Sequence, residues 1–87
     1  MPITQDSANH KFTDGQGAEL EYQLPAPGVI EFTHTFVPES ERGQGVGETL
    51  AKTGLEYARQ HQLKVVPSCP FVADYIQKHS EYADLLA

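Results

Sequence analysis

The sequence predicts a single α+β domain built on a mixed, mainly antiparallel sheet of about four strands, with a crossover helix after the third strand and a C-terminal helix. A length of 87 residues allows one domain, residues 1–87. Apolar residues recur at every second position in the first half of the chain and at helical spacing after Pro38. A helix-length segment then separates two strand-like segments, which predicts a parallel pair joined by a right-handed crossover.

Two strands are expected before residue 25. Residues 10–13 form a short strand that fits the edge of a sheet, and residues 14–17 form a turn whose residues tolerate positive φ. Residues 18–24 alternate between apolar and polar side chains, which is typical of a half-buried strand. Its expected buried face consists of Ala18, Leu20, Tyr22 and Leu24.

The third expected strand covers residues 29–37, after a turn at residues 25–28. Alternation places two sets of side chains on opposite faces of this strand. One set is Ile30, Phe32, His34 and Phe36, and the other is Glu31, Thr33 and Thr35. The three strands together form an antiparallel meander. The loop that leaves the third strand lies at a carboxyl end, where ligands bind in sheets with a parallel crossover.

The spacing of apolar residues predicts a long helix from residue 46 to about residue 61, after a polar loop at residues 39–45. Its expected apolar stripe contains Val46, Leu50, Tyr57 and Ala58. Gly54 lies within this helix, where glycine costs about 1 kcal/mol relative to alanine. We therefore expect Gly54 to allow close packing of the helix on the sheet.

The last part of the chain predicts a short buried strand and a second helix. Residues 63–66 form the strand, which Pro67 ends, and residues 71–79 form the helix. The side chains expected to point inward from this helix are Phe71, Val72, Tyr75 and Ile76. Residues 80–86 form a final turn or short helix.

Composition excludes several classes of function. Twelve acidic residues against six Lys and Arg give a net charge of -6, which argues against nucleic-acid binding. An acidic surface tolerates a cationic partner such as an amine, although it also serves solubility alone. No apolar run of about 18 residues predicts a membrane span, and the polar first twenty residues argue for a cytoplasmic protein without a secretory signal.

Cysteine, histidine and chain length set further bounds. A lone cysteine, Cys69, excludes an internal disulfide framework. The four histidines lie far apart without paired spacing, so we expect no metal site. They are His10, His34, His61 and His79. A domain of this size has a thin core, which leaves room for a partner chain, including a second copy in a homodimer, to cover part of it.

The loop at residues 42–47 is the strongest candidate for ligand binding. Its glycines alternate with other residues directly before the long helix. Glycine lets backbone N–H groups converge on one point, and the positive end of a helix dipole favours an anion such as a pyrophosphate. Arg42 adds a positive charge. The alternative is a flexible surface loop that only caps the helix. The loop lacks the Lys-Ser or Lys-Thr of a Walker motif, and dinucleotide-binding glycines follow the first strand of a parallel unit rather than a meander.

Two motifs together resemble a known family. Arg42, Gly45 and Gly47 form an Arg-x-x-Gly-x-Gly pattern that resembles the signature of the GCN5-related N-acetyltransferases, and it opens the long helix as it does there. The tail resembles that of small, single-domain members of this superfamily. Its two elements are Pro67-Ser68-Cys69-Pro70 and Tyr75-Ile76-Gln77-Lys78-His79-Ser80-Glu81-Tyr82. The resemblance extends from about residue 12 to residue 86.

The resemblance implies acetyl-coenzyme A as the ligand. Backbone N–H groups of residues 44–47 would hold its pyrophosphate, and its pantetheine arm would lie near the end of the third strand. The thioester would point between that strand and the strand at residues 63–66. The implied cofactor-binding residues are Phe36, Val37, Arg42, Gly43, Gln44, Gly45, Val46 and Gly47.

One departure from the family concerns the acceptor. Full-length members carry two helices between their first strands and further strands at the C-terminus, and these parts shape the acceptor site. Here a tight turn joins the first strands, so the fold is expected to be a truncated form of the family fold. The resemblance implies an N-acetyltransferase that acts on a small-molecule or peptide amine. It also leaves open a non-catalytic module that binds acyl-coenzyme A.

Three side chains are candidates for the chemistry. Cys69 follows the last strand and is a candidate nucleophile that would form an acetyl-cysteine, with His34 as the neighbour that lowers its pKa. Tyr75 matches the tyrosine with which many family members protonate coenzyme A. Each has a structural alternative: a buried cysteine, a satisfied core histidine and a core tyrosine. Glu31 is a further candidate base, with a solvated strand carboxylate as its alternative.

Overall fold

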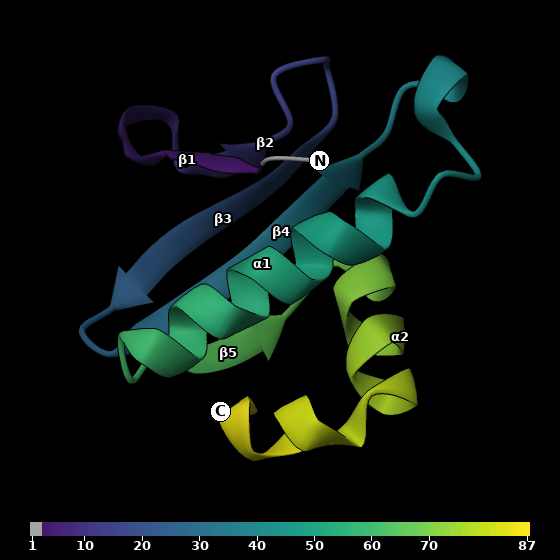
Figure 1. The fold of residues 1–87 in the computed structure, drawn as a ribbon. Coiled ribbons are helices and arrows are strands. Elements are labelled where there is room, and N and C mark those ends of the chain that lie inside the picture. Colours follow the sequence, from purple (N-terminus) through teal and green to yellow (C-terminus); the bar gives the residue numbers. More distant parts are fainter. Residues whose placement is uncertain (1–2) are drawn as a thin grey trace.

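The meander that alternation predicts is present in the computed structural model, which describes residues 3–87 (Figure 1). It belongs to a five-stranded sheet whose strands follow one another in chain order. The strands are β1 (Thr4–Asp6), β2 (Lys11–Thr13), β3 (Glu19–Ala26), β4 (Val29–Phe36) and β5 (Lys64–Pro67). The first four pair antiparallel, and β5 pairs with β4 in parallel. The mixed, mainly antiparallel α+β fold is therefore confirmed, with one strand more than expected.

The additional strand, β1, lies at the edge of the sheet outside β2. It has only three residues, most of them exposed, and pairs with β2 from Thr4 opposite Thr13 to Asp6 opposite Lys11. A single turn of 3-10 helix, η1 (Ser7–Asn9), returns the chain, and the Asp6 carboxylate accepts from Asn9 N at 3.3 Å. A strand without a buried face leaves no alternation of apolar residues, so the sequence pattern did not predict it.

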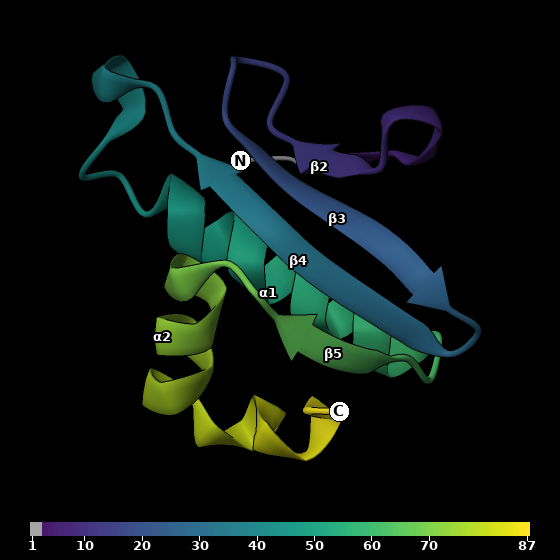
Figure 2. The same cartoon turned by 180° about the vertical axis from the view of Figure 1, so that it is seen from behind.

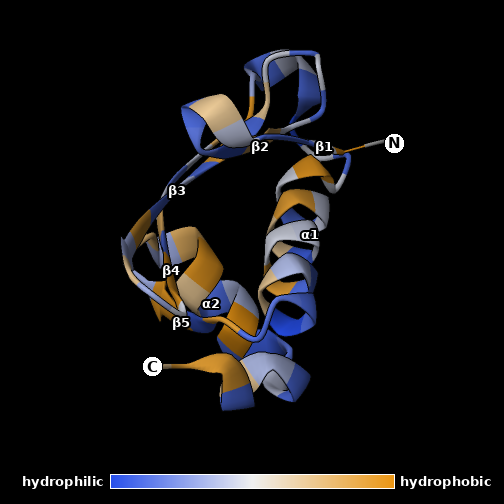
Figure 3. Cartoon of the chain, turned by 90° about the vertical axis from the view of Figure 1, so that its left-hand side faces the viewer, coloured by the Kyte–Doolittle hydropathy of each residue, from blue (hydrophilic) through white to orange (hydrophobic). Residues whose placement is uncertain are grey.

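Both long helices lie on one face of the sheet. Helix α1 (Val46–Gln60) crosses from β4 to β5, and α2 (Pro70–Lys78) follows β5. Figure 3 shows both helices on the same side of the strands, and Figure 2 shows no helix over the opposite face of β3 and β4. Antiparallel sheets commonly leave one face to solvent. Within residues 3–87, no helix has the length and apolar character that a membrane crossing requires.

The contact between α1 and the sheet depends on Gly54. A methyl group at Gly54 would lie 2.8 Å from Cε1 of Phe32, closer than real contacts allow, and 3.0 Å from Cδ2 of Leu20. Phe32 and Leu20 are almost completely buried in the shared core. The expected close approach of α1 to the sheet at Gly54 is therefore confirmed.

The face expected for the end of β4 is wrong because the strand contains a bulge. Glu21 pairs with His34, but the next residue of β3, Tyr22, pairs with Phe32, so Thr33 is the extra residue. A bulge shifts the alternation by one residue. His34 and Phe36 are therefore exposed, and Thr35 faces the helices instead. Alternation holds before the bulge, where Ile30 and Phe32 are buried as expected.

The C-terminal segment covers the outer edge of β5. A six-residue 3-10 helix, η3 (Ser80–Leu85), follows α2, and Ala87 N then donates to Val65 O at 3.0 Å. The Tyr82 hydroxyl donates to Glu56 of α1 at 2.6 Å. Arg59 of α1 binds both carboxylate oxygens of Asp84 at 3.1 Å. The final turn of the chain is thus attached to α1 as well as to the sheet.

Candidate functional site

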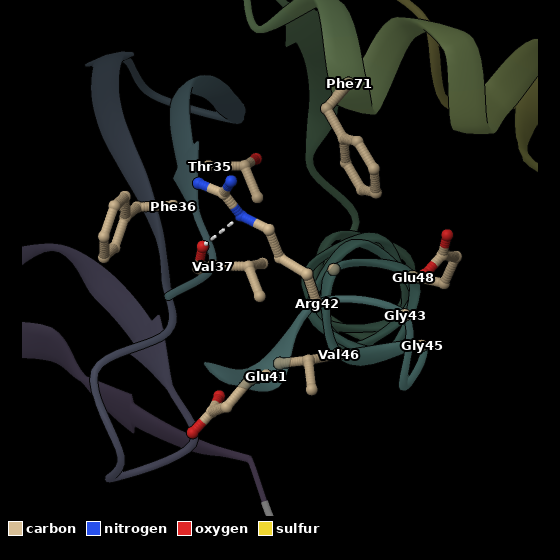
Figure 4. Close-up of a pocket in the computed structure, with 11 residues that line it drawn as sticks. Thr35, Phe36, Val37, Glu41, Arg42, Gly43, Gly45, Val46, Glu48 and Phe71 are labelled. Carbon is tan, nitrogen blue, oxygen red and sulfur yellow. Dashed lines mark hydrogen bonds between the residues drawn. The ribbon is translucent and has the colours of Figure 1, made fainter. Parts of the chain in front are cut away.

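A cavity of about 600 Å³ opens at the carboxyl end of β4, next to the start of α1 (Figure 4). A short 3-10 helix, η2 (Glu39–Glu41), carries the chain around the rim of this cavity. Residues from β4, the glycine loop, the first turn of α1 and the start of α2 line it. They are Thr35, Phe36, Val37, Glu41, Arg42, Gly43, Gly45, Val46, Gly47, Glu48 and Phe71.

The cavity exists because β5 ends before β4 does. Pairing between these parallel strands stops at Phe32 opposite Pro67, and Cys69 N makes a last contact with Phe32 O at 2.9 Å. Residues 33–36 continue β4 without a neighbouring strand on that side. Their outward backbone groups are therefore available to a ligand that lies along the strand, because backbone polar groups near a protein interior require partners.

The glycine loop leaves the start of α1 uncapped. Gly43 and Gly45 have φ of 82° and 76°, in the left-handed region that favours glycine. Gly45 is the N-cap and has no side chain that accepts from the first N–H groups of the helix. These N–H groups and the positive end of the dipole of this 15-residue helix border the cavity. The arrangement is suited to an anion.

Gly47 has a packing role that its position in the motif does not reveal. A methyl group there would lie 2.8 Å from Cζ of Phe71, so the aromatic ring lies directly against the first turn of α1. Phe71 is 37% exposed and forms a wall of the cavity, although helical spacing predicted it to point inward. The two glycines nearest the start of the helix therefore differ: a side chain at Gly45 would meet open space, whereas one at Gly47 would collide with the Phe71 ring.

Two acidic side chains, Asp14 and Glu41, lie close together next to the glycine loop. Glu41 is 8% exposed, and its side chain points away from Arg42 in Figure 4. A hydrogen bond with Asp14 and burial raise the pKa of Glu41. Burial opposes ionisation of Asp14, but the N–H groups of Gln16 and Ala18 and the bond with Glu41 lower its pKa overall. The closeness of the two carboxyl groups connects the β2–β3 turn to the rim of the cavity.

Arg42 lies across the cavity. Its Nε donates to the backbone oxygen of Val37 at 3.1 Å, which joins the glycine loop to the end of β4 (Figure 4). Glu48, exposed in the first turn of α1, lies on the opposite wall. Arg42 is the only basic side chain among the residues that line the cavity. It therefore has the main influence on whether an anion is attracted there.

Cys69 lies close to the cavity but does not line it. It is the N-cap of α2 and is 4% exposed, and its sulfur lies 3.3 Å from Oγ1 of Thr35. Thr35 in turn lines the cavity, so it separates Cys69 from the space. A role for Cys69 as a nucleophile toward a thioester stays a prediction.

The structure does not bring His34 or Tyr75 to the cavity. The bulge turns His34 to the exposed face, opposite to Thr35, so the expected pairing of His34 with Cys69 is wrong. Tyr75 is 8% exposed, stacks on His79 at 4.1 Å and lies 6.1 Å from the ring of Tyr82. Burial raises the pKa of Tyr75, with smaller contributions from nearby carboxylates. A role for Tyr75 in protonating coenzyme A stays a prediction.

Seven of the eight expected cofactor-binding residues line the cavity. The exception is Gln44, which is exposed and directs its amide toward Ser40 O at 3.5 Å. Four residues that line the cavity were not expected to do so from the sequence: Thr35, Glu41, Glu48 and Phe71. Glu48 could have been expected in the lining because it lies in the first turn of the helix that begins at the glycine loop. Thr35 could not, because its position depends on a bulge that the alternation of residues does not reveal. Residues 3–87 contain no cluster of three His, Cys, Asp or Glu side chains arranged to hold a metal ion.

Comparison with known proteins identifies the family of this chain. Protein NATD1 of Gallus gallus and of Homo sapiens are each 29% identical over 62 residues, or 71% of this chain. The chain spans 56% and 55% of their respective lengths. A GCN5-like protein of Staphylococcus aureus, solved by NMR in solution, is 32% identical with a TM-score of 0.77, and the match covers 99% of this chain and 87% of that one. A family model described as GCN5-related N-acetyl-transferase matches residues 9–85, so the chain belongs to the GCN5-related N-acetyltransferase family.

Proposed function

We propose that this protein transfers an acetyl group from acetyl-coenzyme A to an amine, and that the cavity at the end of β4 holds the cofactor. One observation carries the proposal. The free edge of a strand and the uncapped, glycine-lined start of α1 border the same cavity of about 600 Å³. A long ligand with a polar arm and a charged pyrophosphate matches both features at once.

The pyrophosphate would lie at the start of α1. Backbone N–H groups of Val46 and Gly47 are unpaired helix donors, and the left-handed Gly43 and Gly45 turn the loop toward the same space. Arg42 would add the single positive charge. Phosphate oxygens would then receive N–H donors together with the helix dipole.

The pantetheine arm would lie along the free edge of β4. Residues 33–36 and Val37 have no strand on that side, and amide groups of the arm are able to bond with their backbone as a strand would. Phe71 would cover the arm from the side of α2. The thioester would then lie between β4 and β5, in the direction of Thr35.

Transfer requires an amine without its extra proton, a donor for the developing oxyanion and a proton for the leaving thiolate. A backbone N–H near Phe36 or Val37 is the candidate oxyanion donor. In direct transfer the amine nitrogen would bond to the acetyl carbon as the C–S bond breaks, and the proton that the nitrogen loses would neutralise the leaving thiolate. In the covalent route the Cys69 thiolate would bond to the acetyl carbon and release the thiolate of coenzyme A, and the amine would then take the acetyl group, lose a proton and release Cys69. A small-molecule or peptide amine is the proposed acceptor.

A second candidate function is binding of acyl-coenzyme A without turnover. It is favoured by the positions of Cys69 and Tyr75, both buried and both outside the lining of the cavity. Among the residues that line the cavity, only Glu41, Arg42 and Glu48 carry charge. Glu41 points away toward Asp14 in its pair, which leaves few groups to handle a proton.

Binding is tested with a matched pair of glycine variants. Gly45 and Gly15 have nearly equal φ, 76° and 78°, and a methyl group at either would meet nothing within 4 Å. Alanine should therefore add about the same strain, roughly 1 kcal/mol, at both. We expect Gly45→Ala to weaken acetyl-coenzyme A binding about tenfold by calorimetry and Gly15→Ala to leave it unchanged. Equal affinities of the two variants would contradict this placement of the pyrophosphate.

Turnover separates the two candidate functions. The protein should be incubated with acetyl-coenzyme A and a panel of polyamines and lysine peptides, with release of free thiol as the signal. Release that depends on an added amine supports transfer, whereas tight binding without release supports the non-catalytic module. Intact mass of the wild type and of Cys69→Ala then distinguishes the routes. An added acetyl mass that requires Cys69 indicates the covalent route, and turnover that survives Cys69→Ala indicates direct attack.

A further inference from the structure

Arg42 occupies the position that a ligand along β4 would need. Its Nε–H donates to Val37 O at 3.1 Å, and Figure 4 shows the side chain reaching from the glycine loop over to the end of the strand. Val37 lies just past β4, whose pairing with β3 ends at Phe36 opposite Glu19. The Val37 oxygen is thus an acceptor on the wall of the cavity, and Arg42 already uses it.

The Arg42 side chain binds a backbone carbonyl although carboxylates are plentiful in this chain. Acidic residues outnumber Lys and Arg by twelve to six, and Glu39 and Glu41 lie within three residues of Arg42. Arg42 nevertheless takes part in none of the ion pairs found within residues 3–87. Glu41 is buried toward Asp14 instead. The guanidinium is therefore held by a neutral carbonyl, a weaker partner than a carboxylate, and is easily released to an anion.

We propose that Arg42 is a ligand-displaced latch: its side chain is bound to Val37 O at the wall of the cavity, and an arm that binds the end of β4 must break this contact. This inference rests on the proposed function for the identity of that arm, pantetheine. Once released, the guanidinium moves the short distance to the start of α1 and pairs with phosphate. The Arg42 side chain thus opposes binding of the neutral pantetheine arm and favours binding of the charged phosphates.

Opposite effects on two ligands follow from this arrangement. Pantetheine carries the amide arm without any phosphate, so it must break the latch and receives nothing from the freed guanidinium. Coenzyme A breaks the same contact and gains the pairing with phosphate. Removal of the Arg42 side chain should therefore tighten pantetheine binding and weaken coenzyme A binding. An arginine that only binds phosphate would leave pantetheine binding unaffected.

The experiment compares the wild type, Arg42→Ala and Lys52→Ala by NMR chemical-shift titration with pantetheine and with coenzyme A. Lys52→Ala is the matched control because it removes one exposed positive charge from α1 outside the cavity. We expect Arg42→Ala to bind pantetheine about threefold more tightly, the effect of one solvent-exposed hydrogen bond, and coenzyme A about tenfold more weakly. Lys52→Ala should match the wild type for pantetheine.

A direct readout accompanies the affinities. The Arg42 Nε–H resonance of the free wild type should exchange slowly with solvent, and it should shift when pantetheine is added. If coenzyme A binds but Arg42→Ala leaves pantetheine affinity unchanged or lower, the latch is wrong and the proposed function stands. If neither ligand binds the wild type or Arg42→Ala, both the proposed function and the latch are wrong.

Discussion

Glu41 shows how one buried side chain near the cavity couples stability to pH. Its pKa is raised by the hydrogen bond with Asp14 and by burial, so the folded protein holds a proton that the unfolded chain has already released. The contribution of this proton is fully present below the ordinary pKa of 4.5. It is lost as pH rises through the raised value, when two carboxylates face each other. Asp14, whose pKa is lowered, acts in the opposite sense only at more acidic pH.

We therefore expect Glu41→Gln to change the pH profile of stability. Glutamine keeps the shape and the donor but cannot ionise, so it preserves the contact with Asp14 at every pH. The melting temperature of the variant relative to the wild type should increase between about pH 5 and pH 8. Thermal melts across this range measure the difference. A difference that stays constant with pH would show that the pair does not titrate in this window.

Glu48 leads to a prediction about affinity. It is exposed, lies in the first turn of α1 and faces the proposed pyrophosphate site. A carboxylate a few ångströms from an anion in a largely aqueous site opposes binding by about 1 kcal/mol. Glu48→Gln should thus tighten coenzyme A binding about fivefold at low salt, with a smaller gain at high salt. Calorimetry at two salt concentrations tests it, with Glu39→Gln, outside the cavity lining, as the control.

At the scale of the element, β4 shows what the sequence pattern was able to predict. The existence, order and approximate bounds of β3, β4, α1, β5 and α2 follow from the change in apolar period and from Pro38 and Pro67. The bulge at Thr33 does not, because one extra residue depends on how neighbouring strands pair. The glycine loop was predicted from its motif. That Thr35 and Phe71 line the cavity became apparent only from the three-dimensional arrangement.

Two glycines of α1 give a paired prediction. A methyl group would meet Phe32 at Gly54 and Phe71 at Gly47, at 2.8 Å in each case. Phe32 is completely buried, whereas Phe71 is 37% exposed and free to turn into the cavity. We expect Gly54→Ala to destabilise the protein by about 1–3 kcal/mol despite the better helix propensity of alanine.

Gly47→Ala should change stability much less than Gly54→Ala and instead displace the Phe71 ring. Urea unfolding measures the first effect, and the chemical shifts of Phe71 measure the second. Equal losses of stability would mean that the wall of the cavity at Phe71 is as rigid as the core. In that case the cavity is already shaped for its ligand rather than adjusted by it.

At the scale of the whole molecule, the fold has two layers, a sheet and one set of helices, with the other sheet face uncovered (Figure 2). So small a domain buries a limited fraction of its surface, and each connection between distant segments matters more. The segment at residues 80–87 supplies such connections to α1 and β5. The sequence predicted this segment as a short helix or turn, but not that it lies along the edge of β5.

Tyr82 allows this connection to be tested. Its hydroxyl donates to Glu56, and burial followed by this bond raises its pKa. Tyr82→Phe removes the bond and leaves a partly buried carboxylate with one partner fewer. We expect a loss of about 1–2 kcal/mol in the free energy of unfolding. Tyr57→Phe is the control because no hydrogen bond of its hydroxyl is found within residues 3–87, and similar losses in both variants would contradict the prediction.

The gap beside β4 also bears on strand addition by another chain. An unpaired strand edge is a template on which another chain can add a strand and begin to aggregate. Here the exposed length is only residues 33–36, and Pro38 and Pro67, which cannot donate a backbone hydrogen bond, stand at its two ends. A second polypeptide would thus find only residues 33–36 on which to extend the sheet. Such an opening favours the arm of a narrow small molecule over a long added strand.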